Sequence, residues 1–348
     1  MFNANTTTVL SKPIRVLHVL GTDVPGASAD KGQWQAGGTN DTGQMLRMVG
    51  PAIQVSSMMI TPAFLKQGRG WEPGKFDLVW NAISDPDQNP KCLSVFKAAF
   101  EDKGRPVVNR ADKVAQTRRH IVPSKLAGKS GIVAPKTLLL RLPNAHRIKA
   151  AAIAADFSFP AILRRAGTHN GAVLGVYESV ESLSGIFGDR KNTYFLTEFV
   201  DVRWADGLFR KTRCFFVGDK ILTRHHVITN TWNVHGSNSR DIMPGREDLI
   251  QESRHVLIAG YEGLPDRVRA SLEIVRETIG LDYCGIDFCM MENDDIVVFE
   301  CNATMNFRPK FSNPITQHNK VSMPRLMSGL LGLVSKLSGV NATGLTPV

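Results

Sequence analysis

Short apolar runs separated by glycine, proline and aspartate make up the first third of the chain. Residues 14–20, 53–60 and 76–83 form such runs, and their composition and flanking turn residues predict β-strands. Between residues 89 and 103, large apolar side chains recur at helical spacing, and residues 106–108 begin another strand. Because strands that alternate with helices form parallel sheets, we expect a small α/β domain over residues 1–108.

The rest of the chain shows a different pattern, in which apolar runs follow one another as hairpins. Gly218 and Asp219 separate two such runs by a typical two-residue turn, and residues 292–294 separate two more. The strands expected here lie within residues 132–142, 159–176, 194–200, 212–217, 220–227, 282–291 and 295–301. The helices expected here lie within residues 112–126, 147–156, 265–279 and 323–337. Mixed hairpins and helices predict an α+β architecture.

The composition is that of an ordinary globular protein. The chain has 348 residues, of which 43% are hydrophobic and 21% charged, enough for about two to three domains. It has no apolar run long enough to span a membrane, and its polar first residues do not resemble a secretory signal. The five cysteines include no Cys-x-x-Cys pair, which favours reduced thiols over disulfides or zinc. We therefore expect a cytoplasmic protein with no membrane partner.

The charge balance narrows the class of ligand. Lysine and arginine number 42 against 32 acidic residues, which gives a formal net charge of +10. The densest basic clusters are only pairs, such as Arg118 with Arg119, and there is no basic tail or aromatic-interleaved basic stripe. A small, phosphate-rich ligand explains this excess better than nucleic acid does.

Two carboxylates and an amide lie on the second expected hairpin. Glu300 and Asn302 are two residues apart and therefore face the same side of a strand. Asp287 lies 13 residues before Glu300, so a hairpin can bring it beside them. Hard oxygen ligands of this kind suit Mg²⁺ or Mn²⁺ held jointly with phosphates. The neighbouring residues are apolar, so we favour metal binding over solvent-facing polar positions.

A glycine-rich segment follows the strand that begins near residue 159. Arg164 ends this strand, and Gly167, His169 and Gly171 lie in the loop after it. Glycines let backbone N–H groups approach phosphate oxygens, and an arginine neutralises the phosphate charge. The segment predicts a phosphate-binding loop, although an ordinary glycine-rich hairpin explains it equally well when it is read alone.

Two further segments complete the candidate site. The apolar strand before Asp201 ends in Glu198, Phe199 and Val200, a pattern compatible with an adenine-binding edge or with a buried strand that reaches the surface. Arg213 and Arg224 lie on the first expected hairpin. If they face each other across the turn, they form a cationic wall for phosphates; the alternative is a pair of exposed charges.

Taken in order, these segments resemble the ATP-grasp superfamily over about residues 107–306. That superfamily has a strand with Pro-x-x-x-Lys/Arg, a glycine-rich lid, a strand ending in glutamate, a hairpin arginine and a final Asp…Glu-x-Asn set. The chain shows Pro160 with Arg164, then the glycines, Glu198, Arg213 and the set of Asp287 with Glu300 and Asn302. The nearest likeness is to ligases similar to glutathione synthetase and to ribosomal-protein glutamate ligases. Arg164 departs from the usual lysine.

The resemblance implies a domain organisation and a set of ligands. It implies an N-terminal α/β domain over 1–108, a central subdomain over 109–197, a C-terminal subdomain over 198–316, and a helix and tail over 317–348. The two α+β subdomains would clasp ATP and two Mg²⁺ ions, with Mn²⁺ as an alternative. Asp287, Glu300 and Asn302 would be the metal ligands. The nucleotide would contact Arg164, Gly167, His169, Gly171, Glu198, Phe199, Val200 and either Arg118 or Arg119.

The activity implied is carboxylate activation. ATP would convert a small-molecule or peptide carboxylate into an acyl phosphate, an amine would displace phosphate, and Arg213 and Arg224 would be the catalytic cations. A small-molecule kinase and a nucleotide-binding regulator without turnover are the alternatives. The sequence does not name the substrates, and a homodimer is left open.

Overall fold

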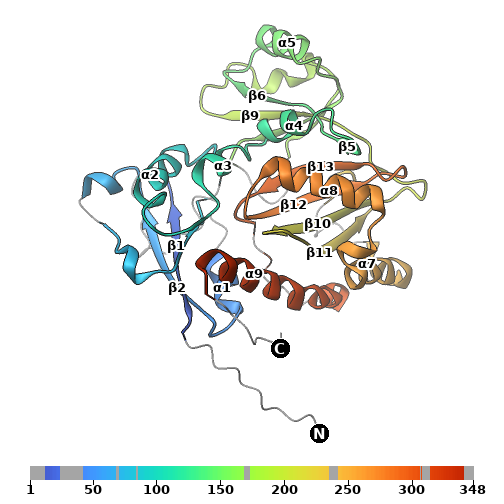
Figure 1. Ribbon diagram of the computed structural model, residues 1–348. Helices are drawn as coiled ribbons and strands as arrows, with labels where there is room; N and C mark the ends of the chain where they lie inside the picture. The colour runs from blue at the N-terminus through green and yellow to red at the C-terminus, as the bar shows by residue number, and fades with distance from the viewer. Residues whose placement is uncertain are drawn as a thin grey trace.

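The computed structural model describes residues 12–23, 42–67, 70–83, 85–167, 173–234, 242–305, 307 and 314–340. These residues form three β-sheets, each the centre of one part of the molecule. In Figure 1 the N-terminal sheet lies at the left, the central sheet at the top, and the large C-terminal sheet at the right. The three parts meet around the connection that carries α3 (Ala111–Ala115) and α4 (Ile121–Leu126).

The N-terminal sheet is parallel, in the order β2-β1-β3-β4. Its inner strands β1 and β3 are buried because helices cover them, which is typical of parallel sheets, whereas the edge strand β2 is partly exposed. The predicted α/β domain with a parallel sheet is therefore confirmed. Its elements are β1 (Ile14–Gly21), α1 (Thr42–Met48), β2 (Ile53–Ile60), η3 (Phe64–Gln67), η4 (Pro73–Lys75), β3 (Leu78–Asn81), α2 (Pro90–Phe100) and β4 (Val107–Val108).

The central sheet is antiparallel, in the order β6-β9-β7-β8. It has a small core of its own, in which Ile148 packs with strand residues such as Leu163 and Leu196. The predicted glycine-rich loop joins β7 to β8, and residues 168–172 of it lie outside the described residues. The elements of this part are β6 (Thr137–Arg141), α5 (Ala145–Ala154), β7 (Ala161–Arg165), β8 (Gly175–Tyr177), η5 (Glu181–Ile186) and β9 (Thr193–Glu198).

The large sheet has the order β11-β10-β12-β13-β5, and both predicted hairpins lie in it. Its strands are β10 (Phe209–Val217), β11 (Lys220–Thr229), β12 (Tyr283–Met290), β13 (Ile296–Asn302) and β5 (Ile132–Val133). Strand β5 falls within the range expected for the central subdomain, yet it pairs in parallel with β13. The large sheet thus draws one short strand from an earlier part of the chain.

Helices cover both faces of the large sheet. Helices α7 (Glu247–Ala259) and α8 (Asp266–Ile279) pack on one face, with the short η6 (Tyr261–Gly263) between them. Helix α9 (Met323–Ser338), which follows η7 (Pro314–Ser322), packs on the other face.

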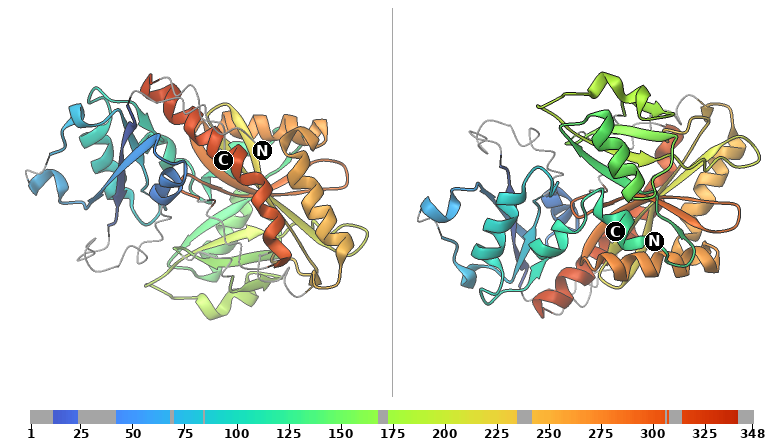
Figure 2. Two further views of the ribbon diagram at one scale, coloured as in Figure 1. Left: turned by 90° about the horizontal axis from the view of Figure 1, so that it is seen from below. Right: turned by 90° about the horizontal axis from the view of Figure 1, so that it is seen from above.

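Helix α9 also holds the N-terminal domain in place, because it contacts β1 and β3 as well as β10 and β11. In Figure 2 it runs across the large sheet and reaches the N-terminal domain. Its buried leucines share one apolar cluster with Trp80 of the N-terminal sheet and Phe215 of the large sheet. None of the helices in the described ranges has the length and hydrophobicity needed to cross a membrane.

Asn109 joins the N-terminal sheet to the large sheet by hydrogen bonds. This fully buried residue has a positive φ of 61°, a conformation that asparagine tolerates better than most residues. Its side chain donates to the carbonyls of Tyr283 (2.7 Å) and Ala303 (3.1 Å) and accepts from the Tyr283 N–H (3.0 Å). The side chain of Asn81, at the end of β3, donates to the backbone carbonyl of Asn109 (2.9 Å). These bonds fix the N-terminal strand ends beside the end of β13.

Candidate functional site

A cavity opens where the three parts of the chain meet. The loop after β3 lines it with Asp85 and Asp87, and the central sheet lines it with side chains of β6, β7 and β9. The end of β13 and the segment around α3 and α4 close the remaining sides. Of the residues predicted from sequence, this cavity brings together Arg164, Gly167, Glu300, Asn302, Arg118 and Arg119.

The predicted β12–β13 hairpin is present, with the expected alignment. Asp287 lies opposite Glu300, and Gly285 lies opposite Asn302, so Glu300 and Asn302 share one face with Asp287 beside them. Asp287 is only 5% exposed, and both of its oxygens accept from the Arg213 guanidinium, at 2.6 and 2.8 Å. Burial alone would raise the pKa of Asp287, but Arg213 and Lys211 outweigh burial and hold this pKa far below its ordinary value.

Glu300 and Asn302 lie nearer the cavity than Asp287 does. Glu300 Oε1 is 3.7 Å from Arg119 Nη2, and Asn302 Oδ1 accepts from the backbone N–H of Thr304 at 2.9 Å. Within the described ranges, no three His, Cys, Asp or Glu residues lie close enough together to hold a metal ion. A site here would thus consist of two carboxylates and one amide oxygen. These hard donors fit Mg²⁺ or Mn²⁺, and their role as metal ligands stays a prediction.

Arg164 is a mostly buried cation that lines the cavity. Its side chain makes no hydrogen bond or ion pair with any other residue in the described part of the chain. Burial lowers its pKa to about 10, repulsion from Arg119 adds to this effect, and attraction to Glu300 opposes it. A buried guanidinium without a counterion is unfavourable, so this position is suited to an anionic ligand.

The root of the glycine-rich loop touches the N-terminal domain. Gly167 has a φ of 76°, and a Cβ at this position would lie 1.8 Å from Nε2 of Gln88. The backbone conformation therefore favours glycine here, and a larger residue would also have to displace the end of the Gln88 side chain. His169 and Gly171, the other loop residues predicted to bind nucleotide, lie outside the described residues.

The three residues predicted for the adenine edge do not line this cavity. Both oxygens of Glu198 accept from backbone N–H groups, those of Ser158 and Lys136, each at 2.9 Å. Phe199 packs edge-on against Trp232 with ring centroids 5.8 Å apart, and Val200 joins the same apolar cluster. Their nucleotide-binding role stays a prediction.

Sequence reasoning missed the residues of β6 and β9 that do line the cavity. Phe195 and Thr197 face it, and the hydroxyl of Thr197 lies 3.0 Å from that of Thr137 on β6. Strand alternation was the available signal, because residues two apart on β9 face the same side.

The structure distinguishes the two neighbouring arginines between which the sequence could not choose. Arg118 turns to the N-terminal loop, where its Nε lies 3.4 Å from Asp87 and its Nη2 donates to the carbonyl of Pro86 at 3.2 Å. Arg119 instead approaches Glu300. Arg119 is thus the member of the pair that lies beside Arg164 and the predicted metal ligands, and the N-terminal loop is a part of the site that the sequence did not indicate.

The expectation that Arg213 lies opposite Arg224 is wrong by one residue. Arg213 pairs with His225, because a β-bulge after Arg213 shifts the alignment of the two strands. Arg224 donates to the carbonyls of Phe307 (3.2 Å) and Asn319 (3.3 Å). Burial lowers its pKa to about 10, and repulsion from Arg213 adds to this, so the two cations are still neighbours.

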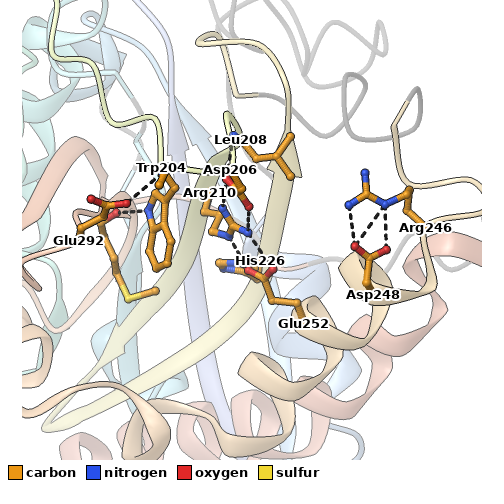
Figure 3. Close-up of polar contacts among 11 residues, drawn as sticks. Trp204, Asp206, Leu208, Arg210, His226, Arg246, Asp248, Glu252 and Glu292 are labelled. Atoms are coloured by element: carbon orange, nitrogen blue, oxygen red, sulfur yellow. Dashed lines mark hydrogen bonds and ion pairs between the residues drawn. The ribbon is translucent and has the colours of Figure 1, made fainter.

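A second polar cluster lies away from the cavity, on the face of the large sheet that carries α7 (Figure 3). Its centre is Arg210, which is 7% exposed and binds two carboxylates. Asp206 accepts from it at 2.7 and 3.1 Å, and Glu252 of α7 accepts at 2.6 and 3.0 Å. The guanidinium also lies 4.7 Å from the centroid of the Trp204 ring. This cluster anchors the connection from β9 to β10.

The comparisons with known proteins identify the fold. No family model and no curated protein sequence matches the chain. Solved structures match nearly its whole length, among them the VanG D-Ala:D-Ser ligase from Enterococcus faecalis, with 13% identity, a TM-score of 0.53, and coverage of 93% of this chain and 100% of that chain. The chain has the ATP-grasp fold.

Two more solved structures with this fold are similar to the chain. The D-alanine–D-alanine ligase from Coxiella burnetii shares 10% identity at a TM-score of 0.53, covering 94% of this chain and 95% of that chain. A RimK domain ATP-grasp protein from Sphaerobacter thermophilus shares 14% identity at a TM-score of 0.50, covering 92% and 99%. The expected architecture, an N-terminal α/β domain followed by α+β parts, is therefore confirmed.

Proposed function

We propose that the chain is an ATP-dependent ligase that joins a carboxylate to an amine. The γ-phosphoryl group of ATP would pass to the substrate carboxylate, leaving ADP, and the amine would then displace phosphate from the acyl phosphate. The observation that carries this proposal is Arg164, a mostly buried cation in the cavity of an ATP-grasp fold that makes no ion pair or hydrogen bond with the described residues. A polyphosphate is the ligand that best satisfies such a position.

The neighbouring side chains support the same assignment. Arg119 adds a second cation beside Arg164, and Glu300 with Asn302 lines the same cavity. Asp287, Glu300 and Asn302 would hold Mg²⁺, which neutralises phosphate charge and polarises the transferred group when bound. The protein's own contribution would be to position the phosphates and to stabilise charge with fixed arginines.

The wall that the central sheet contributes to the cavity fits a nucleoside. Phe195, opposite Arg164, and Ile162 offer apolar surface on this wall, and Thr137 and Thr197 offer hydroxyl groups. Such a mixture of apolar walls and a few polar groups is typical of small-molecule sites. We place the base and sugar against these residues, and the predicted contacts of Glu198, Phe199 and Val200 belong to the same proposal.

The test has two stages. Calorimetry with a non-hydrolysable ATP analogue and Mg²⁺ should show binding, and the absence of heat and of a thermal shift at millimolar nucleotide would remove the proposal. Hydroxylamine, a general acyl acceptor, should then trap activated acids as hydroxamates with release of ADP and phosphate. ADP release with the phosphate retained on the product would indicate a kinase instead, and binding without turnover would indicate a regulator.

A further inference from the structure

A row of cations continues along the large sheet beyond Asp287, away from the nucleotide cavity. Lys211 and Arg213 are two residues apart on β10 and therefore share one face. Arg224 on β11 lies next to Arg213 on that face, where it contacts Phe307. Figure 1 shows β10 and β11 on the side of β12 opposite to β13.

Positive charge exceeds negative charge in this row. Asp287 is the carboxylate that both Arg213 and Lys211 face, with Lys211 Nζ at 3.5 Å and Arg213 Nε at 2.6 Å. Glu300, the nearest other carboxylate on this hairpin, lies toward Arg119. Within the described residues, the partners of Arg224 are neutral oxygens of Phe307, Asn319 and Ser322.

These cations are also shielded from water. The Lys211 side chain is 16% exposed, and Arg224 is 6% exposed. Neighbouring like charges that are mostly buried repel one another unless an anion lies between them. The row is therefore suited to an anionic group that is separate from the phosphates near Arg164.

The position of this row relative to the cavity indicates how far apart the two anionic groups of the substrate would be. Neighbouring strands lie about 4.8 Å apart, and β10 is the second strand from β13, so Lys211 lies about 10 Å across the sheet from the strand of Glu300. The Lys211 side chain reaches back toward that strand, because its Nζ lies 3.5 Å from Asp287, which is opposite Glu300. The two anionic groups of the acid would therefore be only a few carbon atoms apart.

We propose that the carboxylate substrate carries a second anionic group, a carboxylate or a phosphate, which Lys211 binds together with Arg224. This inference rests on the proposed ligase function and names the class of its acid substrate. Lys211 is the residue that selects for the second anion, because its position on β10 faces the same side as Arg213 while its amine is not bound bidentately to Asp287.

The experiment uses matched acids that differ only in the second charge. Hydroxamate formation is measured with L-glutamate against L-glutamine, glutarate against glutaramate, and 3-phosphoglycerate against glycerate. The wild-type protein should prefer the doubly charged member of at least one pair by about 10- to 100-fold in kcat/KM, the range expected for charge-assisted hydrogen bonds. The carboxylate and phosphate pairs show which anion the site takes.

Three variants assign the preference to Lys211. Lys211→Met should raise KM for the doubly charged acid about 10-fold or more relative to the singly charged member of the same pair, and this ratio cancels any effect of the variant on the neighbouring Asp287. Lys211→Glu should reverse the order of the pair, which a purely structural role would not do. Lys220→Met, at the exposed start of β11, is the matched control and should leave both members unchanged.

Each outcome decides the inference. An equal loss for both members in Lys211→Met, or a wild-type protein with no preference within any pair, would overturn it. Failure to use or bind any acid of the panel while Mg²⁺–ATP still binds would also overturn it and leave the nucleotide site standing. Failure to bind Mg²⁺–ATP would instead remove the proposed function itself.

Discussion

Two mostly buried arginines of this chain have opposite surroundings. Arg210 binds Asp206 and Glu252 and packs against Trp204; burial would lower its pKa, but the two carboxylates outweigh burial and raise it. Arg164 makes no ion pair or hydrogen bond with the described residues, and its pKa is lowered to about 10 although Glu300 attracts it. The charge of Arg210 is neutralised within the protein, so this arginine serves the fold. The charge of Arg164 is neutralised only when an anion binds.

One carboxylate from each of the two regions gives the sharpest test of this contrast. Glu300→Gln should reduce turnover about 100- to 1,000-fold, because preorganised charge acts mainly on the transition state. Its free energy of unfolding should change by no more than about 1 kcal/mol, since Arg119 is 3.7 Å away and the contact is partly exposed. Hydroxamate assays and urea denaturation measure the two quantities.

Glu252→Gln is the matched counterpart of Glu300→Gln. We expect it to lower the free energy of unfolding by about 1–2 kcal/mol while leaving turnover per folded molecule unchanged. Near-normal turnover in Glu300→Gln would remove the metal assignment, and lost turnover in a folded Glu252→Gln protein would show that the Arg210 cluster also serves the reaction.

Arg210→Ala should produce the largest loss of stability. It leaves Asp206 and Glu252 without their cation and removes the guanidinium from the Trp204 ring. Because both carboxylates are partly exposed, we expect a loss of about 2–4 kcal/mol rather than that of a fully buried pair. Arg254→Ala, on the exposed side of α7, is the control and should change stability by about 0.5 kcal/mol at most. Similar values for the two variants would contradict a structural role for Arg210.

Arg164→Ala should have the reverse effect. We expect Mg²⁺–ATP to bind about 10- to 100-fold more weakly, because one or two charge-assisted hydrogen bonds are lost. Thermal stability should stay level or increase, since the variant removes a mostly buried cation without a counterion. Calorimetry and thermal melting measure the two effects.

Two neighbouring variants locate the effect of Arg164. Arg164→Lys should retain part of the affinity, because it keeps the charge and loses the planar fork. If Arg164→Ala binds ATP as well as the wild type and Arg165→Ala does not, the phosphate contact belongs to Arg165 instead.

Local patterns were sufficient to predict the part of the site that lies on one hairpin. Asp287, Glu300 and Asn302 are close in sequence, and a short turn with strand alternation fixes which of them face one side. The prediction that Arg213 lies opposite Arg224 was wrong because a β-bulge adds a residue to one of the two strands. Nothing in the local pattern of charges and apolar residues marks that bulge.

Contacts between segments that are distant in the sequence could not be predicted from local sequence patterns. Glu252 lies 42 residues after Arg210, on a helix that the apolar periodicity did not indicate. Asp87 and Gln88 reach the site only because Asn109 and α9 fix the N-terminal domain against the large sheet. Such positions depend on how the three sheets assemble, and a single sequence carries no direct signal of that assembly.

Acid should weaken the Arg210 cluster in a predictable pH range. Burial would raise the pKa of Glu252, but the close approach of His226 Nε2, 3.5 Å away, and the hydrogen bonds from Arg210 outweigh it and lower the pKa to about 2 from an ordinary value of 4.5. Because the folded-state pKa is the lower one, the ionised carboxylate stabilises the protein fully above about pH 5. This stabilisation is lost as the pH falls from about 5 toward 2. We therefore expect the stability difference between the wild type and Glu252→Gln, about 1–2 kcal/mol at neutral pH, to shrink steadily over this range in urea titrations. A difference that stays constant down to pH of about 3 would mean that packing, not charge, makes Glu252 matter to the fold.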